Sequence, residues 1–283
     1  MLMRLIRSLL ASSGRSHGGS RIDDRSGAES PMQRANRLNE AHGAAPMALH
    51  LDILYGGLRI NGQGLLELVA RCLSESDMPL TPHKHFHRPL ASYFLAQYFL
   101  HARDLPGDQA ECGVYRGTSA LLLCRTAQGG EPAYRGAGLH IVDSFEGLAA
   151  PTDADRFDVM ESTGERSGMA VKGGGFAAAL DSVRGTLQDF PDIAYHKGWI
   201  PAVFSSLPEK SWSFVHVDVD HYEPTYASLD YFYPRLSTGG VIICDDYGAP
   251  LFPGAHRAWD RYCEEHDVPY VVLDTGQSVI LKT

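Results

Sequence analysis

Two apolar runs that each end in a pair of carboxylates constrain this 283-residue chain more than any other feature. The first, FVHVDVD, ends with Asp218 and Asp220, and the second, GGVIICDD, ends with Asp245 and Asp246. A helix-length segment joins them, which predicts a strand–helix–strand unit with a right-handed crossover and parallel, adjacent strands. Ligand sites of open α/β sheets lie beyond the carboxyl ends of the strands, where both acidic pairs fall.

The four carboxylates are expected to converge. Side chains alternate along a strand, so Asp218 and Asp220 would share one face, and neighbouring strands are only ~4.8 Å apart. Carboxylates this close repel one another unless protons or a cation compensate them. A hard divalent ion with oxygen ligands is the simplest compensation. Solvated acidic loop ends are the alternative, but two acidic pairs on consecutive strands favour a metal or catalytic site.

Composition fits an ordinary enzyme with one large α/β domain and appendages, at 44% hydrophobic and 21% charged residues. The net charge of −9 argues against a partner that is a nucleic acid or an anionic membrane. No apolar run approaches the ~20 residues of a membrane span. The five cysteines are odd in number and lack a CxxC pair, which indicates reduced thiols and a cytoplasmic protein.

The first 104 residues divide into two segments. Residues 1–46 are rich in Gly, Ser, Arg, Asp and Asn without a hydrophobic period, which predicts a disordered leader. Residues 47–104 form an N-terminal helical or lid segment in this interpretation. It contains a helix starting at GLLELVARCL and a second helix over LASYFLAQYFLHAR, with Pro89 in the first turn. The buried stripe of the first helix is expected to be Leu65, Leu66, Val69 and Leu73.

The stretch TPHKHFHRP lies between these helices and places His83, His85 and His87 at alternate positions. Three such side chains could bind a metal. No Cys or carboxylate sits among them, so a solvated loop is the favoured interpretation.

Residues 105–283 alternate between strand and helix patterns. Predicted strands are 108–114, 139–145, 192–198, 214–220 and 239–246, and a hairpin around Thr275 closes the chain. Thr118 and Ser119 are expected to cap the first helix of this region. A long insertion, 146–175, precedes a predicted helix over 176–190 whose apolar residues are Phe176, Leu180, Val183 and Leu187. Five strand–helix units and a hairpin predict a doubly wound α/β sheet.

The segment ECGVYRG supplies the second chemical signal, because it places two glycines where a strand turns into a helix. Glycine lets a ligand approach the main chain, and the helix N-terminus offers free N–H groups. Asp143 ends the next strand, where an acidic residue can accept both hydroxyls of a ribose. A structural glycine turn is the alternative, but the glycines and Asp143 together favour a nucleoside ligand. Glu111 would then orient the loop or meet the positive end of the ligand.

These blocks resemble a known family when they are taken in order. ECGVYRG, VDSFEGL, HKGWI, HVDVDHYEPT, FYPRLSTGGVIICDDYG and AHRAW look like the metal-dependent macrocin O-methyltransferase (TylF) family over about residues 105–259. The resemblance implies a class I S-adenosylmethionine-dependent fold, with a Rossmann-like seven-stranded sheet and an antiparallel last strand. It also implies methyl transfer to a hydroxyl of a sugar or another natural-product acceptor.

The resemblance further implies a role for particular residues. Mg²⁺ would be held by Asp218, Asp245 and Asp246, and Asp220 would be the general base. The cofactor site implied by the matching blocks consists of Glu111, Gly113, Tyr115, Gly117, Thr118, Ser119, Asp143, Ser144 and Phe145, with Gly198 and Trp199 close to it.

Two departures from the family pattern limit what carries over. His221 stands where a leucine is common, and residues 80–104 do not match the family's lid segment. The acceptor therefore stays open among sugar, glycoside, phenol and peptide-linked hydroxyls, and a homo-oligomer is compatible with the sequence.

The base is assigned from residue chemistry. His221 suits proton transfer near pH 7, but in a regular strand it would point away from the face shared by Asp218 and Asp220, so Asp220 is favoured. His216 would share the strand face of Asp218 and Asp220, but it lies deeper in an apolar strand. This position favours a buried, hydrogen-bonded core histidine.

Two other classes of function remain open from the sequence. A nucleotide-sugar glycosyltransferase also uses a DxD pair to hold a divalent ion, although the glycine turn and DSFEG suit a nucleoside–sulfonium site better. A non-catalytic cofactor-binding homologue would have no chemical need for all four carboxylates.

Overall fold

A computed structural model of the protein describes residues 55–78, 88–160 and 166–283. The predicted leader 1–46 and the stretch His83–His87 lie outside the described residues. No helix in the described part of the chain combines the length and the apolarity needed to cross a membrane.

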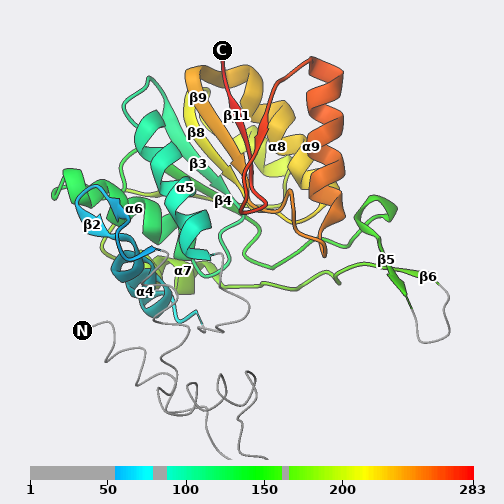
Figure 1. The fold of residues 1–283 in the computed structure, drawn as a ribbon, viewed down its shortest axis with the longest axis horizontal. Helices are drawn as coiled ribbons and strands as arrows, with labels where there is room; N and C mark the ends of the chain where they lie inside the picture. Colours follow the sequence, from blue (N-terminus) through cyan, green and yellow to red (C-terminus); the bar gives the residue numbers. More distant parts are fainter. Residues whose placement is uncertain (1–54, 79–87, 161–165) are drawn as a thin grey trace, which may run out of the picture.

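The centre of the molecule is a seven-stranded sheet with the order β10-β11-β9-β8-β3-β4-β7 (Figure 1). Its strands are β3 (Asp108–Cys112), β4 (Leu139–Asp143), β7 (Ala194–Lys197), β8 (Trp212–Val217), β9 (Leu236–Cys244), β10 (Val271–Val272) and β11 (Ser278–Leu281). The five strands β9, β8, β3, β4 and β7, neighbours in that order, pair in parallel. In contrast, β11 is antiparallel to both β9 and β10. The predicted doubly wound sheet with an antiparallel last strand is confirmed, as is the closing hairpin.

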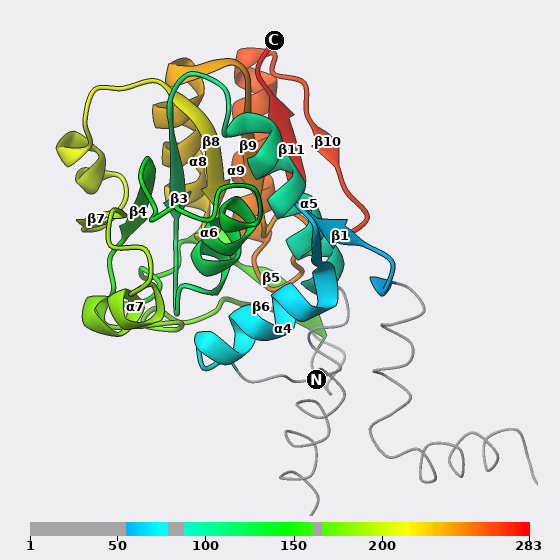
Figure 2. The same ribbon diagram turned by 90° about the vertical axis from the view of Figure 1, so that its left-hand side faces the viewer.

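Helices cover both faces of this sheet (Figures 1 and 2). The core on one face receives α4 (Leu65–Glu75), α5 (Arg88–Ala102), α6 (Thr118–Gly130) and α7 (Leu180–Thr186). The core on the other face receives α8 (Tyr222–Phe232) and α9 (Pro253–His266). Three 3₁₀ turns are η1 (Asp153–Asp155), η2 (Ala202–Ser206) and η3 (Tyr233–Arg235). Two-stranded sheets form from β1 (Arg59–Ile60) with β2 (Gln63–Gly64) and from β5 (Phe157–Met160) with β6 (Arg166–Met169).

The apolar strand sequences follow from burial on both faces of the sheet. In β9, Val241 and Ile243 enter the core under α5, whereas Ile242 enters the core under α8 and α9. A strand with helices on both sides has no solvent face, so it appears as a continuous apolar run. Each fully buried aliphatic side chain stabilises the fold by roughly 1.5–3 kcal/mol. This burial fixes the strand ends at which the polar residues gather.

Two local predictions were wrong. Thr118 and Ser119 do not cap α6: the N-cap is Gly117, in a left-handed conformation with φ of 84°, and the Thr118 hydroxyl hydrogen-bonds Ser76 Oγ at 2.8 Å. The predicted helix over 176–190 forms only at Leu180–Thr186. Phe176 has φ of 57° and is 50% exposed, so its backbone is not helical and its ring does not enter the core.

Gly113 is required where the end of β3 passes the end of β8. Its φ is +81°, and a Cβ built on it would lie 1.8 Å from the carbonyl oxygen of Asp218. A side chain there would overlap backbone that cannot withdraw without moving Asp218. The two strands therefore meet closely only because this residue is glycine.

We expect Gly113→Ala to lower the free energy of unfolding by at least ~2 kcal/mol, because it adds both a backbone overlap and a strained φ. Gly185→Ala is the matched control: Gly185 lies in α7, and a Cβ added to it would meet nothing within 4 Å. Alanine there should stabilise the helix by roughly 0.5–1 kcal/mol. Urea denaturation of both variants measures the difference, and equal stabilities would contradict this view of Gly113.

Candidate active site

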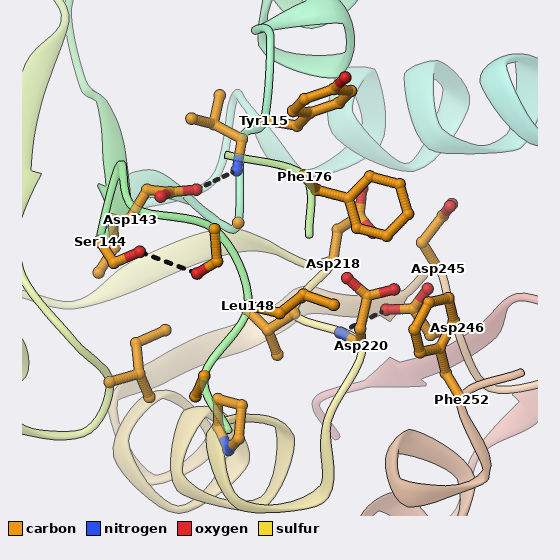
Figure 3. A pocket seen from close by; sticks show the side chains of 18 of the residues that line it. Tyr115, Asp143, Ser144, Leu148, Phe176, Asp218, Asp220, Asp245, Asp246 and Phe252 are labelled. Carbon is orange, nitrogen blue, oxygen red and sulfur yellow. Dashed lines mark hydrogen bonds between the residues drawn. The ribbon is translucent and has the colours of Figure 1, made fainter. Parts of the chain in front are cut away.

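A cleft of about 300 Å³ opens at the carboxyl ends of β3, β4, β8 and β9. Figure 3 shows Asp143 and Ser144 on one side of it and the carboxylates of Asp218, Asp220, Asp245 and Asp246 on the other. Its lining also includes Arg88, Gly113, Tyr115, Leu148, Phe176, Gly198, Trp199, Pro224 and Phe252. The predicted position of a ligand site, beyond the strand ends, therefore coincides with a real cleft.

Asp143 organises the glycine turn at the first side of the cleft. Its Oδ2 accepts the Val114 N–H at 2.7 Å and its Oδ1 accepts the Phe145 N–H at 2.5 Å. Burial raises the pKa of the Asp143 carboxyl, although the backbone donors of Phe145 and Val114 act in the opposite direction. The carboxylate thus fixes the turn after β3 while its edge lines the cleft.

Neighbouring segments complete this side. The Ser144 hydroxyl donates to the Gly147 carbonyl at 3.1 Å, and the Gly198 N–H donates to the Asp143 carbonyl at 2.9 Å. Trp199 lines the cleft and is 42% exposed. Phe145 is buried beside the turn and is not among the lining residues.

A second cavity of about 170 Å³ adjoins the cleft and shares Arg88, Asp218 and Asp245 with it. Thr118 and Ser119, at the start of α6, line this second cavity and not the cleft. Glu111 lines neither space: it is fully buried, and its Oε1 lies 2.9 Å from Nδ1 of His216. These predicted residues therefore flank the glycine turn in the sequence but do not line the cleft.

Three carboxylates converge at the ends of β8 and β9. Val217 pairs with Cys244, so the residues that follow each strand start side by side. Asp218, Asp245 and Asp246 each offer an oxygen within 4.8 Å of the others. Among the described residues this is the one group of three or more His, Cys, Asp or Glu side chains with such spacing. The predicted convergence is confirmed for these three residues.

The predicted reason for the position of Asp220 was wrong. β8 ends at Val217, so Asp218 and Asp220 do not share a strand face, and Asp220 has a left-handed backbone with φ of 62°. Its N–H donates to Asp246 Oδ2 at 2.9 Å, and its side chain lines the cleft. His221 is the N-cap residue of α8, is 3% exposed and does not line the cleft.

Burial and mutual repulsion shift the pKa values of these carboxyls. The pKa of Asp218 is well above its ordinary value because of burial and the charges of Asp246 and Asp245. Asp246 and Asp220 have raised pKa values for the same kinds of reason. Carboxylates this close, with raised pKa values at Asp218, Asp220 and Asp246, fit a hard divalent cation, which three oxygen ligands would hold.

Asp245 differs from its neighbours because other side chains stabilise its charge. Burial opposes ionisation, but His216, Arg88 and Gln277 together hold the pKa of Asp245 below its ordinary value. Burial also lowers the pKa of His216, and the carboxylates of Asp245 and Glu111 outweigh that effect and raise it. The prediction of a buried, hydrogen-bonded His216 is confirmed: it is 1% exposed and paired with Glu111.

Sequence reasoning missed the aromatic wall of the cleft. The ring centroids of Phe176 and Phe252 lie 6.3 Å apart, and Tyr115 meets Phe176 edge-on at 5.5 Å (Figure 3). Tyr115, Phe145 and Phe176 are the three aromatic residues with positive φ in the described chain, and all belong to segments around the cleft. Such strain concentrates at functional sites. No local pattern marked Phe176 or Phe252, and Arg88 was read only as part of a basic stretch.

Comparisons with known proteins show which family this chain resembles. The model of the family described as Macrocin-O-methyltransferase (TylF) matches residues 95–278. Mycinamicin III 3''-O-methyltransferase of Micromonospora griseorubida is 31% identical over 178 residues, or 60% of this chain and 65% of that protein. A tetracenomycin rhamnosyl 4'-O-methyltransferase of Streptomyces olivaceus is 30% identical over 152 residues, or 52% of this chain. Demethyldecarbamoylnovobiocin O-methyltransferase of Streptomyces niveus is 27% identical over 173 residues, or 58% of this chain.

The alignments span between 55% and 65% of the length of these curated relatives. Two solved structures share the fold over a larger part of the chain. The O-methyltransferase NovP has a TM-score of 0.59 at 19% identity and covers 84% of this chain and 99% of its own. The calicheamicin methyltransferase CalS11 has a TM-score of 0.57 at 19% identity and covers 76% of this chain and 91% of its own.

The repulsion among the carboxylates predicts that removing one of them stabilises the protein in the presence of a chelator. A carboxyl whose pKa is raised by folding destabilises the folded state above its ordinary pKa of 3.8, and this effect disappears below that pH. Asp218→Asn should therefore raise the free energy of unfolding at pH 7 by at least ~1 kcal/mol, and the gain should shrink towards pH 3.

Asp274→Asn is the control, because Asp274 is exposed and such surface changes usually stay within about 0.5 kcal/mol. Thermal unfolding with a chelator measures both variants. A destabilised Asp218→Asn protein at pH 7 would show that the carboxylates do not repel one another as described.

Proposed function

The chain belongs to the macrocin O-methyltransferase family, and from this premise we propose that it is a Mg²⁺-dependent enzyme that moves a methyl group from S-adenosylmethionine to a hydroxyl of a sugar or another natural-product acceptor. One observation carries the proposal: a single cleft joins a glycine turn fixed by Asp143 to a cluster of buried carboxylates at the ends of β8 and β9. The first feature suits a nucleoside, and the second suits a cation that activates a hydroxyl.

The cofactor would occupy the side of the cleft near Asp143. The edge of that carboxylate faces the cleft and can accept the ribose hydroxyls, while Gly113 lets the ligand approach the backbone. Gly198 and Trp199 would contact the adenine ring of the cofactor. Thr118 and Ser119 lie at the N-terminus of α6 in the adjoining cavity, where N–H groups and hydroxyls suit the carboxylate of the amino-acid end. Glu111 does not line either cavity, so it would influence the site only indirectly, through its hydrogen bond with His216.

Asp218, Asp245 and Asp246 would hold Mg²⁺, which prefers oxygen ligands. A divalent ion supplies Lewis acidity that favours ionisation of an acceptor hydroxyl. The names of two relatives describe O-methylation of a rhamnosyl-tetracenomycin and of mycinamicin III, and this agrees with the proposed acceptor class.

Asp220 would be the general base. Its carboxylate lines the cleft beside the cluster, and burial together with the Asp218 charge raises its pKa, which makes it a stronger proton acceptor. In the transfer, the acceptor oxygen forms a bond to the methyl carbon as the carbon–sulfur bond breaks. The hydroxyl proton passes to Asp220, and the electron pair of the broken bond stays on sulfur, leaving S-adenosylhomocysteine.

The aromatic wall would align the acceptor. Phe176, Phe252 and Leu148 line the cleft, and Figure 3 shows the two rings beside the carboxylates, where their apolar surfaces would limit the access of water to the reacting groups. Holding a hydroxyl in line behind the methyl group accounts for much of the rate of such a transfer. The glycosyltransferase and non-catalytic alternatives receive no support from this family or fold.

The proposal predicts that S-adenosylhomocysteine binds the purified chain and that methyl transfer to a panel of glycosylated natural products requires a divalent ion. Calorimetry measures the first, and mass spectrometry of the products measures the second. Chelation should abolish turnover and added Mg²⁺ should restore it. Undiminished methyl transfer after verified metal removal would refute the metal role, and binding of a uridine diphosphate sugar without S-adenosylhomocysteine binding would refute the whole proposal.

Asp220→Asn should lose turnover by ~10²–10⁴-fold while it keeps its affinity for Mg²⁺ and S-adenosylhomocysteine. Asparagine suits the test because it tolerates the left-handed backbone at this position and differs only in its inability to take the proton. His221→Ala is the comparison, and it should retain turnover within about tenfold because His221 lies outside the cleft lining. An active Asp220→Asn enzyme with an inactive His221→Ala enzyme would reverse the assignment of the base.

A further inference from the structure

The turn between β10 and β11 brings a buried amide against one of the cluster carboxylates. Gln277 is 1% exposed, and its Nε2 donates to Asp245 Oδ1 at 2.8 Å. Ser278 pairs with Cys244 across the antiparallel strands β11 and β9, so the next residues outward, Gln277 and Asp245, stand opposite each other. The contact is thus a consequence of the register of the last strand.

The amide of Gln277 has a fixed orientation. Its Oε1 accepts a hydrogen bond from the Thr275 hydroxyl at 2.8 Å, which leaves the NH₂ group to face Asp245. A flipped amide would set its oxygen against a carboxylate oxygen and would repel it. The Asp245 carboxylate, which can only accept, therefore determines which end of Gln277 it meets, and the Thr275 hydroxyl satisfies the other end.

The turn itself is held against the segment that follows β9. The Gly248 N–H donates to the Gly276 carbonyl at 2.7 Å, and a Cβ on Gly248 would lie 2.7 Å from the Cα of Gly276. The Leu273 N–H donates to the Gln277 carbonyl at 2.8 Å, which closes the turn. Because the two backbones touch, Gln277 cannot move away from Asp245 without displacing the whole hairpin.

We propose that Gln277 is a positioning residue that orients the Asp245 carboxylate for a divalent cation, with Thr275 holding the far end of its amide. The inference rests on the metal site of the proposed function. Partners of this kind, which hold a ligand side chain from behind, typically change metal affinity by 10–100-fold. A neutral amide is suited to the task because it fixes one oxygen of Asp245 while it leaves the negative charge of the carboxylate for the cation.

His216, in the neighbouring strand β8, lies on the other side of Asp245 from Gln277. Its Nε2 lies 3.9 Å from Asp245 Oδ1, and Glu111 holds the other side of its ring. Asp245 is therefore flanked by His216 of β8 and by Gln277, which supplies its hydrogen bond from the turn before β11.

Gln277→Leu tests the inference, because leucine keeps a side chain of similar size and removes the donor. We expect Mn²⁺ affinity, measured by calorimetry on the full chain, to fall by about 10–100-fold. The affinity for S-adenosylhomocysteine without metal should stay unchanged. Thr275→Val should also lower Mn²⁺ affinity, by a smaller factor, since it removes only the hydroxyl that holds the far end of the amide.

Gln109→Leu is the matched control. Gln109 is another buried glutamine of the same sheet, 7% exposed, whose Nε2 donates to Ser213 Oγ at 3.2 Å. It stands near the amino end of β3, opposite the cluster, so its loss should lower stability without changing Mn²⁺ affinity. A purely structural role for Gln277 would make the two leucine variants behave alike, and that result would overturn the inference.

The outcomes also separate this inference from the proposed function. A wild-type chain that binds no Mn²⁺ overturns both. Wild-type binding that is weakened by Asp245→Asn and unchanged by Gln277→Leu overturns the role of Gln277 alone. Weakened Mn²⁺ binding in Gln277→Leu, together with normal binding in Gln109→Leu, supports it.

Discussion

The parallel pairing of β8 with β3 on one side and β9 on the other is the constraint on which the site depends. Pairing with β9 sets the Val217–Cys244 register and so brings Asp218 beside Asp245 and Asp246. Pairing with β3 presses the glycine turn onto the Asp218 carbonyl, at a distance that no side chain would allow. The Asp143 side and the carboxylate side of the cleft are therefore joined through backbone contacts. A change in either strand register would separate them.

Much of this arrangement was predictable because it follows from local pattern and strand geometry. The apolar runs, which are buried on both faces of the sheet, predicted the strands. The carboxylates at the ends of two of these runs predicted the acidic cluster. The sequence could not predict where β8 stops, because the left-handed backbone of Asp220 depends on the Asp246 carboxylate that accepts its N–H. Helical spacing over 176–190 was misleading at Phe176, whose ring meets Tyr115 and Phe252 instead of the core. Gln277 lies 32 positions from Asp245 in a turn with no chemical motif, so only the folded register reveals it.

The insertion after β4 is tied to the segment that carries Asp220. Asp155, 3% exposed, accepts the Tyr222 N–H at 2.6 Å at the start of α8, and its other oxygen accepts the Thr152 N–H at 2.7 Å. A Cβ on Gly254 would lie 2.0 Å from Asp155 Oδ1, so α9 closes on the same point. A buried carboxylate from the insertion thus satisfies a free N–H at the start of the helix that follows Asp220 and His221. This contact links the insertion, whose residues 147–149 line the cleft, to the segment that carries Asp220.

The two sides of the cleft have different structural origins, and this difference bears on how such a protein can diversify. The groups around Asp143 and the carboxylates sit at the ends of core strands, where an exchange disturbs packing or pairing. Phe176, Leu148 and Phe252 lie in connecting segments outside the seven-stranded sheet, and Phe176 is half exposed. Substitutions in these segments can reshape this part of the cleft lining without altering the sheet. Divergence in ligand preference can therefore accumulate there among descendants that keep the same chemistry.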